Sequence, residues 1–88
     1  MEVDVFDTYA TRSDGGMVRF DMVVPSGTDP SAAYEYAIQW LNSVGLSSAE
    51  LKQSRCNFCH TVSASEKVAS DIEADGFHII RMEGCPAS

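Results

Sequence analysis

The sequence predicts a two-layer α+β domain with the element order β-β-α-β-α-β, and three kinds of pattern support this fold class. Two segments near the N-terminus alternate apolar and polar residues, two later segments repeat apolar residues at helical spacing, and the segment FHIIRME is apolar on both faces. We therefore expect two helices packed on a four-stranded mixed sheet. The 88 residues are enough for one core, so residues 1–88 are expected to form a single compact domain.

The first two strands are predicted from period-two alternation at residues 3–9 and 18–24, on either side of the turn sequence TRSDGG. If Ala10 pairs with Met17, then Asp7 lies opposite Phe20. In that register one face of the hairpin is apolar throughout, except for Asp7. A carboxylate in such a file acts as a general base or, more commonly, as the structural partner of an arginine or a backbone turn.

The first helix is predicted to begin at Pro30, with Asp29 as its N-cap, and to end at Gly45, which suits a left-handed C-cap. Leu46 is placed to make the hydrophobic contact that accompanies such a cap. Within these limits the apolar residues at spacings of three and four are Ala33, Ala37, Leu41 and Val44.

The second helix is predicted from a capping box formed by Ser63 and Glu66, and Gly76 ends it. Val68, Ala69 and Ile72 give its buried stripe.

The third strand is expected to be a short, polar edge strand from Glu50 to Phe58, although Ser47 and Glu50 also fit the capping box of one helical turn. The fourth is expected at residues 77–83 as a central strand. Two helices are expected to cover one sheet face, which leaves the other as a homodimer surface or shielded by loops and Met17.

Charge and composition exclude several partners. Thirteen acidic residues against six scattered bases give a net charge of -7, so neither nucleic acid nor an anionic membrane is an expected partner. The chain has no apolar run of the roughly 20 residues that span a bilayer, and its N-terminus is acidic where a signal peptide is basic. We therefore expect a cytoplasmic protein, in which three cysteines do not form a disulfide framework.

The chemistry-bearing motif is Cys-x-x-Cys-His at Cys56, Cys59 and His60. If the third and fourth strands are parallel, their C-terminal ends share one edge of the sheet, and Cys85 comes close to this motif. His78 lies at the other end of its strand, so it is left out. The predicted metal or thiol site is thus Cys56, Cys59, His60 and Cys85, with zinc as the metal that suits these ligands.

Other interpretations of the motif stay open. It also fits a dithiol redox site before a helix, a nucleophile pair of cysteine with His60, and a haem attachment string, although the last occurs in exported proteins. The structural alternative is that the thiols fill an apolar edge while His60 is solvated.

Four segments together resemble a family of small uncharacterised bacterial proteins known only as a domain of unknown function: VDVFDTYA, VRFDM, CNFCH and GFHIIRMEGC. The resemblance covers nearly the whole chain and implies a compact fold of four strands and two helices. It implies no established activity, substrate, cofactor or partner. Ala10 and Phe77 stand where that pattern has Val and Tyr, and both are packing changes.

These observations favour a small binding or interaction module that is not an enzyme, with a metal or thiol site at the cysteines. The rival hypothesis is a thiol-dependent redox protein or enzyme that uses the same Cys-x-x-Cys.

Overall fold

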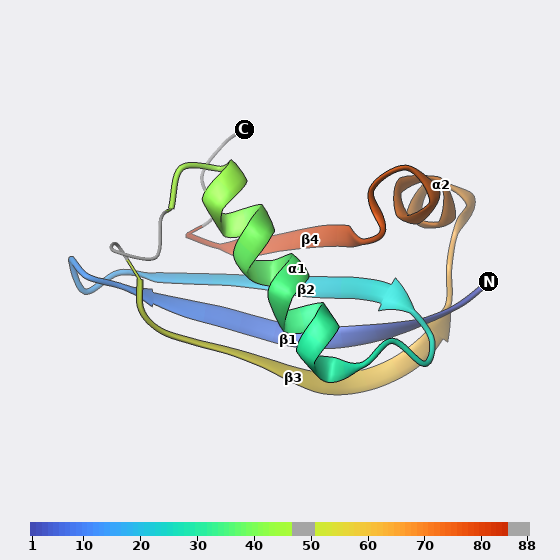
Figure 1. Cartoon of the computed structure of the whole chain (residues 1–88), viewed down its shortest axis with the longest axis horizontal. Coiled ribbons are helices and arrows are strands. Elements are labelled where there is room, and N and C mark those ends of the chain that lie inside the picture. Colours follow the sequence, from blue (N-terminus) through green and yellow to red (C-terminus); the bar gives the residue numbers. More distant parts are fainter. Residues whose placement is uncertain (47–50, 85–88) are drawn as a thin grey trace.

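The computed structural model describes residues 1–46 and 51–84, which form four strands and two helices in the predicted order (Figure 1). The α+β fold class is therefore confirmed. The strands are β1 (Glu2–Arg12), β2 (Met17–Pro25), β3 (Leu51–Ser63) and β4 (His78–Glu83), and the helices are α1 (Pro30–Ser43) and α2 (Glu66–Asp75). The predicted helical turn at Ser47 and Glu50 lies outside the described residues.

The sheet has the order β3-β1-β2-β4, and all three strand pairs are antiparallel. The expected mixed sheet, with β3 and β4 parallel, is thus wrong. Figure 1 shows the reason: α2 lies at the end of the sheet where β3 ends and β4 begins. A helix of 10 residues at that place reverses the chain instead of returning it along the sheet. As a result, β3 and β4 form opposite edges and run in opposite directions.

The β1–β2 hairpin is shifted by one residue from the predicted register. Thr11 pairs with Met17, and Asp7 pairs with Asp21 instead of Phe20. The shift follows from a three-residue turn, in which Gly15 has φ 94° and the Arg12 amide donates to the Gly16 carbonyl. Since successive residues point to opposite faces, this single step moves Asp7 out of the apolar file.

The two helices pack on opposite faces of the sheet, which corrects the expectation that they share one. On one face α1 packs over β1 and β2, where Phe6, Phe20 and Met22 are fully buried. On the other face Ile72 of α2 packs against Val5 and its cross-strand neighbour Val23. The rest of that second face is open, and it carries polar side chains such as Asp7 and Asp21 together with the exposed apolar side chains of Ile80 and Val62.

The first helix ends as predicted. The Gly45 amide donates to the Asn42 carbonyl and the Leu46 amide to the Leu41 carbonyl, which is a Schellman motif with Gly45 at φ 96°. Leu46 is buried in the core beneath it. Asp29 caps the other end by accepting a hydrogen bond from the Ser31 amide.

The second helix begins later than predicted, because β3 continues to Ser63 instead of ending at Phe58. Its N-cap is Ser65, whose hydroxyl accepts from the Val68 amide, and Gly76 ends the helix as expected. No helix among residues 1–46 and 51–84 is long and apolar enough to cross a membrane.

Candidate functional site

Cys56 lies on the face of the sheet that α1 covers, where it is half-buried. The Thr8 hydroxyl is 3.1 Å from the Phe6 carbonyl oxygen and 3.4 Å from Cys56 Sγ, so it can donate a hydrogen bond to either atom. Burial raises the pKa of the Cys56 thiol, the charge of Asp7 adds to this rise, and the Thr8 hydroxyl opposes it. These surroundings favour the neutral thiol over the reactive thiolate.

Cys59 and His60 do not share the surroundings of Cys56. Phe58 pairs with Phe6 and His60 with Val5, so Cys59 is the extra residue of a β-bulge, and it is exposed. Because Cys56 pairs with Thr8, it points to the α1 side of the sheet, and His60 points to the other side.

The predicted four-residue site stays a prediction. Cys85 lies outside the described residues, and the parallel arrangement of strands that was expected to bring it to the motif is absent. Within residues 1–46 and 51–84, no three His, Cys, Asp or Glu side chains are grouped so that they could hold a metal ion.

Asp7 belongs to a polar group on the open part of the second sheet face. Its carboxylate lies 3.7 Å from Arg19 Nη2, which is the structural pairing that the sequence favoured. Asp21 lies directly across from it on β2. Burial raises the pKa of the Asp21 carboxyl and the charge of Asp7 adds to this rise, while His60 and Arg19 act in the opposite direction.

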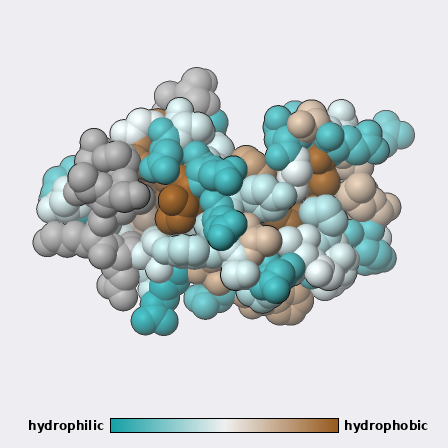
Figure 2. All heavy atoms as spheres, viewed as in Figure 1, coloured by the Kyte–Doolittle hydropathy of each residue, from teal (hydrophilic) through white to brown (hydrophobic). Residues whose placement is uncertain are grey.

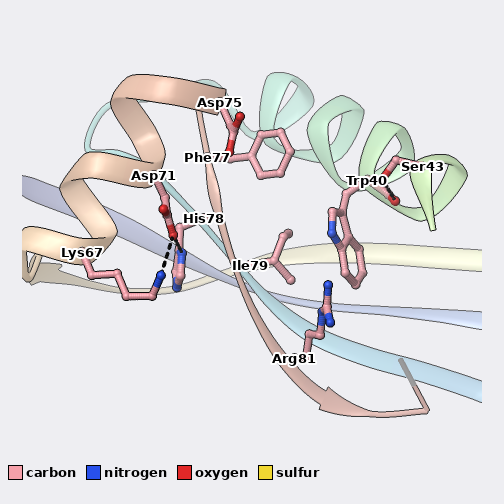
Figure 3. A pocket seen from close by; sticks show the side chains of 9 residues that line it. All are labelled: Trp40, Ser43, Lys67, Asp71, Asp75, Phe77, His78, Ile79 and Arg81. Atoms are coloured by element: carbon pink, nitrogen blue, oxygen red, sulfur yellow. Dashed lines mark hydrogen bonds and ion pairs between the residues drawn. The ribbon is translucent and has the colours of Figure 1, made fainter. Parts of the chain in front are cut away.

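A cleft of about 840 Å³ lies between α1 and α2 along β4, and it is the strongest candidate for a functional site (Figure 3). In Figure 2 the surface is hollowed at its upper rim, between α1 and the connection from α2 to β4. The residues that line the cleft come from both helices and from the strand: Trp40, Ser43, Lys67, Asp71, Asp75, Phe77, His78, Ile79 and Arg81.

Three charged or ionisable side chains form one end of the cleft. His78 Nδ1 lies 2.7 Å from Asp71 Oδ2, and Lys67 Nζ lies 3.7 Å from the same oxygen. His78 is mostly buried, with 17% of its side chain exposed, whereas 81% of the Lys67 side chain is exposed. The carboxylate thus fixes the imidazole ring and leaves the ammonium group in solvent.

An aromatic ring and a guanidinium group form the other end. The Arg81 guanidinium carbon lies 5.6 Å from the centre of the Trp40 ring, which is the geometry of a cation–π contact. Trp40 is held from behind by Phe20, at 4.8 Å between ring centres. In Figure 3 the indole nitrogen lies on the side of the ring turned toward Ile79 and the cleft. Trp40 and Arg81 therefore place N–H donors at this end.

Apolar side chains lie between the two polar ends. Ile79 occupies the middle of the cleft in Figure 3, and Phe77 lies above it. Phe77 is supported by Tyr36, with ring centres 5.3 Å apart. The cleft therefore combines an apolar middle with polar groups at its ends.

The sequence carried a signal for this cleft that motif analysis missed. Lys67, Asp71 and Asp75 recur every four residues, which places them on one face of a helix. His78 was set aside because it was too far from Cys85 along the strand, and Trp40 was assigned to packing. The closeness of α1 to α2 is a tertiary feature, and the spacing of residues within either helix does not predict it.

The fold and the cleft define a small α+β domain with an antiparallel sheet and a polar-ended cleft along one edge strand. The chain belongs to the DUF2024 family, a domain of unknown function, whose profile matches residues 1–82. It is similar to the NMR structure of protein NE1680 from Nitrosomonas europaea, a Northeast Structural Genomics Consortium target. The identity is 37%, the match covers 97% of this chain and 99% of that one, and the TM-score is 0.79. A comparison with curated proteins gave no match.

Proposed function

We propose that this chain is a binding module that holds a small acidic ligand, bearing a carboxylate or a phosphate, in the cleft between α1 and α2. The observation that carries the proposal is the placement of Arg81 against the Trp40 ring at one end of the cleft. This pair offers a planar set of N–H donors next to an apolar surface, which suits an acidic group attached to an apolar body.

The charges at the cleft support an acidic ligand over a basic one. Within the cleft, the Asp71 carboxylate lies 3.7 Å from the Lys67 ammonium and 2.7 Å from His78 Nδ1. Asp75 lies at the upper rim beside Phe77, away from Arg81 (Figure 3). In Figure 3 both carboxylates of the cleft therefore lie apart from Arg81.

The apolar middle of the cleft would hold the body of the ligand. Ile79 and Phe77 offer a surface between the two polar ends, and removing apolar area from water there contributes to affinity. The Asp71–His78 pair would close the other end and keep α2 against β4.

Chemical-shift mapping on the ¹⁵N-labelled full chain tests this function with four fragments of similar size: benzoate, phenyl phosphate, benzyl alcohol and benzylamine. The two anions are expected to bind more tightly than the neutral and cationic fragments and to shift the amides of β4 and the Trp40 indole. Equal affinity for benzoate and benzyl alcohol, or shifts confined to another surface, would contradict the proposal.

A further inference from the structure

The outer edge of β4 lies in the cleft. β4 is the last strand in the sheet order and pairs with β2 on one side. In the part of the chain that the structure describes, no strand pairs with its other side. Such an edge presents unpaired N–H and C=O groups that can bond to another extended chain.

The cleft wraps around this edge instead of lying on one face of the sheet. Ile79 and Arg81 point to the α1 side, whereas His78 points to the α2 side, and all three line the cleft. Figure 1 shows α1 crossing the sheet at β4 and α2 at the start of the same strand. A ligand that fills the cleft therefore lies alongside the main chain of β4.

We propose that the acidic ligand is an extended peptide segment that adds to the outer edge of β4 as a fifth strand. This inference rests on the proposed function, because it names the occupant of the same cleft. Main-chain hydrogen bonds to β4 supply sequence-independent affinity, and the side chains that line the cleft supply selectivity.

The register of β4 fixes which peptide residues are selected. In an antiparallel pair, the residue opposite Arg81 is followed two positions later by the residue opposite Ile79, on the same face. An acidic residue suits Arg81 and an apolar residue suits Ile79, so the recognised pattern is acidic-x-apolar.

β4 suits this role better than β3, which is the other edge of the sheet. β3 is longer, but its pairing with β1 is interrupted by register shifts at two places, and such bulges disturb the regular spacing that a partner strand needs. The pairing of β4 with β2 is regular from His78 to Arg81, which is the part that lies in the cleft.

The probe is the capped peptide acetyl-Ser-Glu-Thr-Val-Thr-Ser-amide, titrated into the ¹⁵N-labelled full chain. Saturable shifts at the β4 amides are expected, together with nuclear Overhauser effects between Hα protons of the peptide and of β4. Two further peptides carry N-methyl groups on alternate residues. One set is expected to lose binding and the other to keep it, because alternate residues of an added strand make the hydrogen bonds.

A double-mutant cycle tests the contact with Arg81. Replacing the peptide Glu by Gln is expected to weaken binding about tenfold to the wild-type chain and to have no effect on Arg81→Gln. Arg12→Gln is the matched control, because Arg12 pairs with Asp14 in the hairpin turn. No coupling in the cycle, equal loss from both N-methyl sets, or shifts on β3 would overturn the inference.

Titration with benzoate and the other three fragments separates this inference from the function on which it rests. If benzoate binds in the cleft while the peptide does not, the cleft takes small acids only, and the peptide inference fails alone. If neither binds, both fail. Sedimentation of the chain tests whether a second copy occupies the same edge. If the chain self-associates and this association abolishes the peptide shifts at β4, the edge belongs to a second copy, and the inference is overturned.

Discussion

His78 Nδ1 on β4 and Asp71 Oδ2 on α2 lie 2.7 Å apart and join the second helix to the edge strand of the sheet. The apolar contact of α2 with the sheet is small, since Ile72 is its one residue in the buried class within the described chain. The polar pair is therefore expected to contribute a large share of what holds α2 in place, and α2 forms one side of the cleft.

Asp71→Asn is expected to destabilise the chain by about 1 kcal/mol, because a charge-assisted hydrogen bond is lost at a partly exposed site. Urea unfolding at neutral pH measures the change. Glu73→Gln is the control, since Glu73 is exposed on the same helix. Equal effects of the two substitutions would show that the Asp71–His78 pair does not hold α2.

Asp21→Asn is expected to stabilise the chain by about 0.5 kcal/mol at neutral pH. Burial and the facing charge of Asp7 raise the pKa of Asp21, so the folded state favours the protonated carboxyl. The stability that protonation contributes is fully present below the unfolded pKa and is lost as the pH rises through the raised folded pKa. The advantage of the variant in urea unfolding should therefore disappear at acidic pH. A destabilised variant would mean that the attraction of Asp21 to His60 and Arg19 outweighs both costs.

Asp4→Asn is expected to destabilise the chain. The Thr61 hydroxyl donates to Oδ1 at 2.6 Å and the Gly27 amide to Oδ2 at 3.1 Å, and these bonds lower the pKa of the Asp4 carboxyl below 3.8. A lowered pKa gives stability that is present above the unfolded value and is lost as the pH falls through the folded one. NMR titration of the Asp4 side chain checks the direction, and Thr61→Val should raise its pKa. An unchanged titration in Thr61→Val would refute this account.

Cys59 is expected to react with iodoacetamide faster than Cys56, because Cys59 is exposed and burial raises the pKa of the Cys56 thiol. Timed alkylation followed by peptide mass spectrometry measures both rates. Equal rates would contradict the burial of Cys56.

Native mass spectrometry of the wild-type chain tests the predicted site at Cys56, Cys59, His60 and Cys85. If those residues form a metal site, native mass spectrometry should show zinc that is lost on denaturation and is absent from Cys56→Ser. An apo mass with three free thiols would contradict that site.

Much of the fold could be predicted because its determinants are local. Alternation located β1 and β2, Asp29 and Gly45 marked the limits of α1, and Gly76 marked the end of α2. Each of these signals depends on residues within one or two turns of the chain.

The sheet topology and the hairpin register could not be predicted in the same way. One residue more in the turn at Gly15 reverses which β1 side chains face α1, and the turn sequence TRSDGG suits either length. The direction of β4 depends on where α2 packs, and that depends on long-range contacts such as those of Ile72 with Val5 and Val23 and of Asp71 with His78.

The candidate site was missed for a related reason. The cysteines drew attention to one motif, and their convergence depended on the direction of β3 and β4. The cleft depends instead on two helices packing on opposite faces of one edge strand. Trp40 and His78 are 38 positions apart in the sequence, and no short motif links them.

The most direct test of the account is the dissociation constant of phenyl phosphate for the wild-type chain, Arg81→Gln and Arg12→Gln, followed by fluorescence. Trp40 is the chain's single tryptophan, so the signal comes from the cleft itself. Binding is expected to quench or shift this signal. Arg81→Gln is expected to weaken the binding of phenyl phosphate about tenfold, whereas Arg12→Gln is expected to leave it unchanged. Equal dissociation constants for all three proteins would show that the cleft is not an acid-binding site.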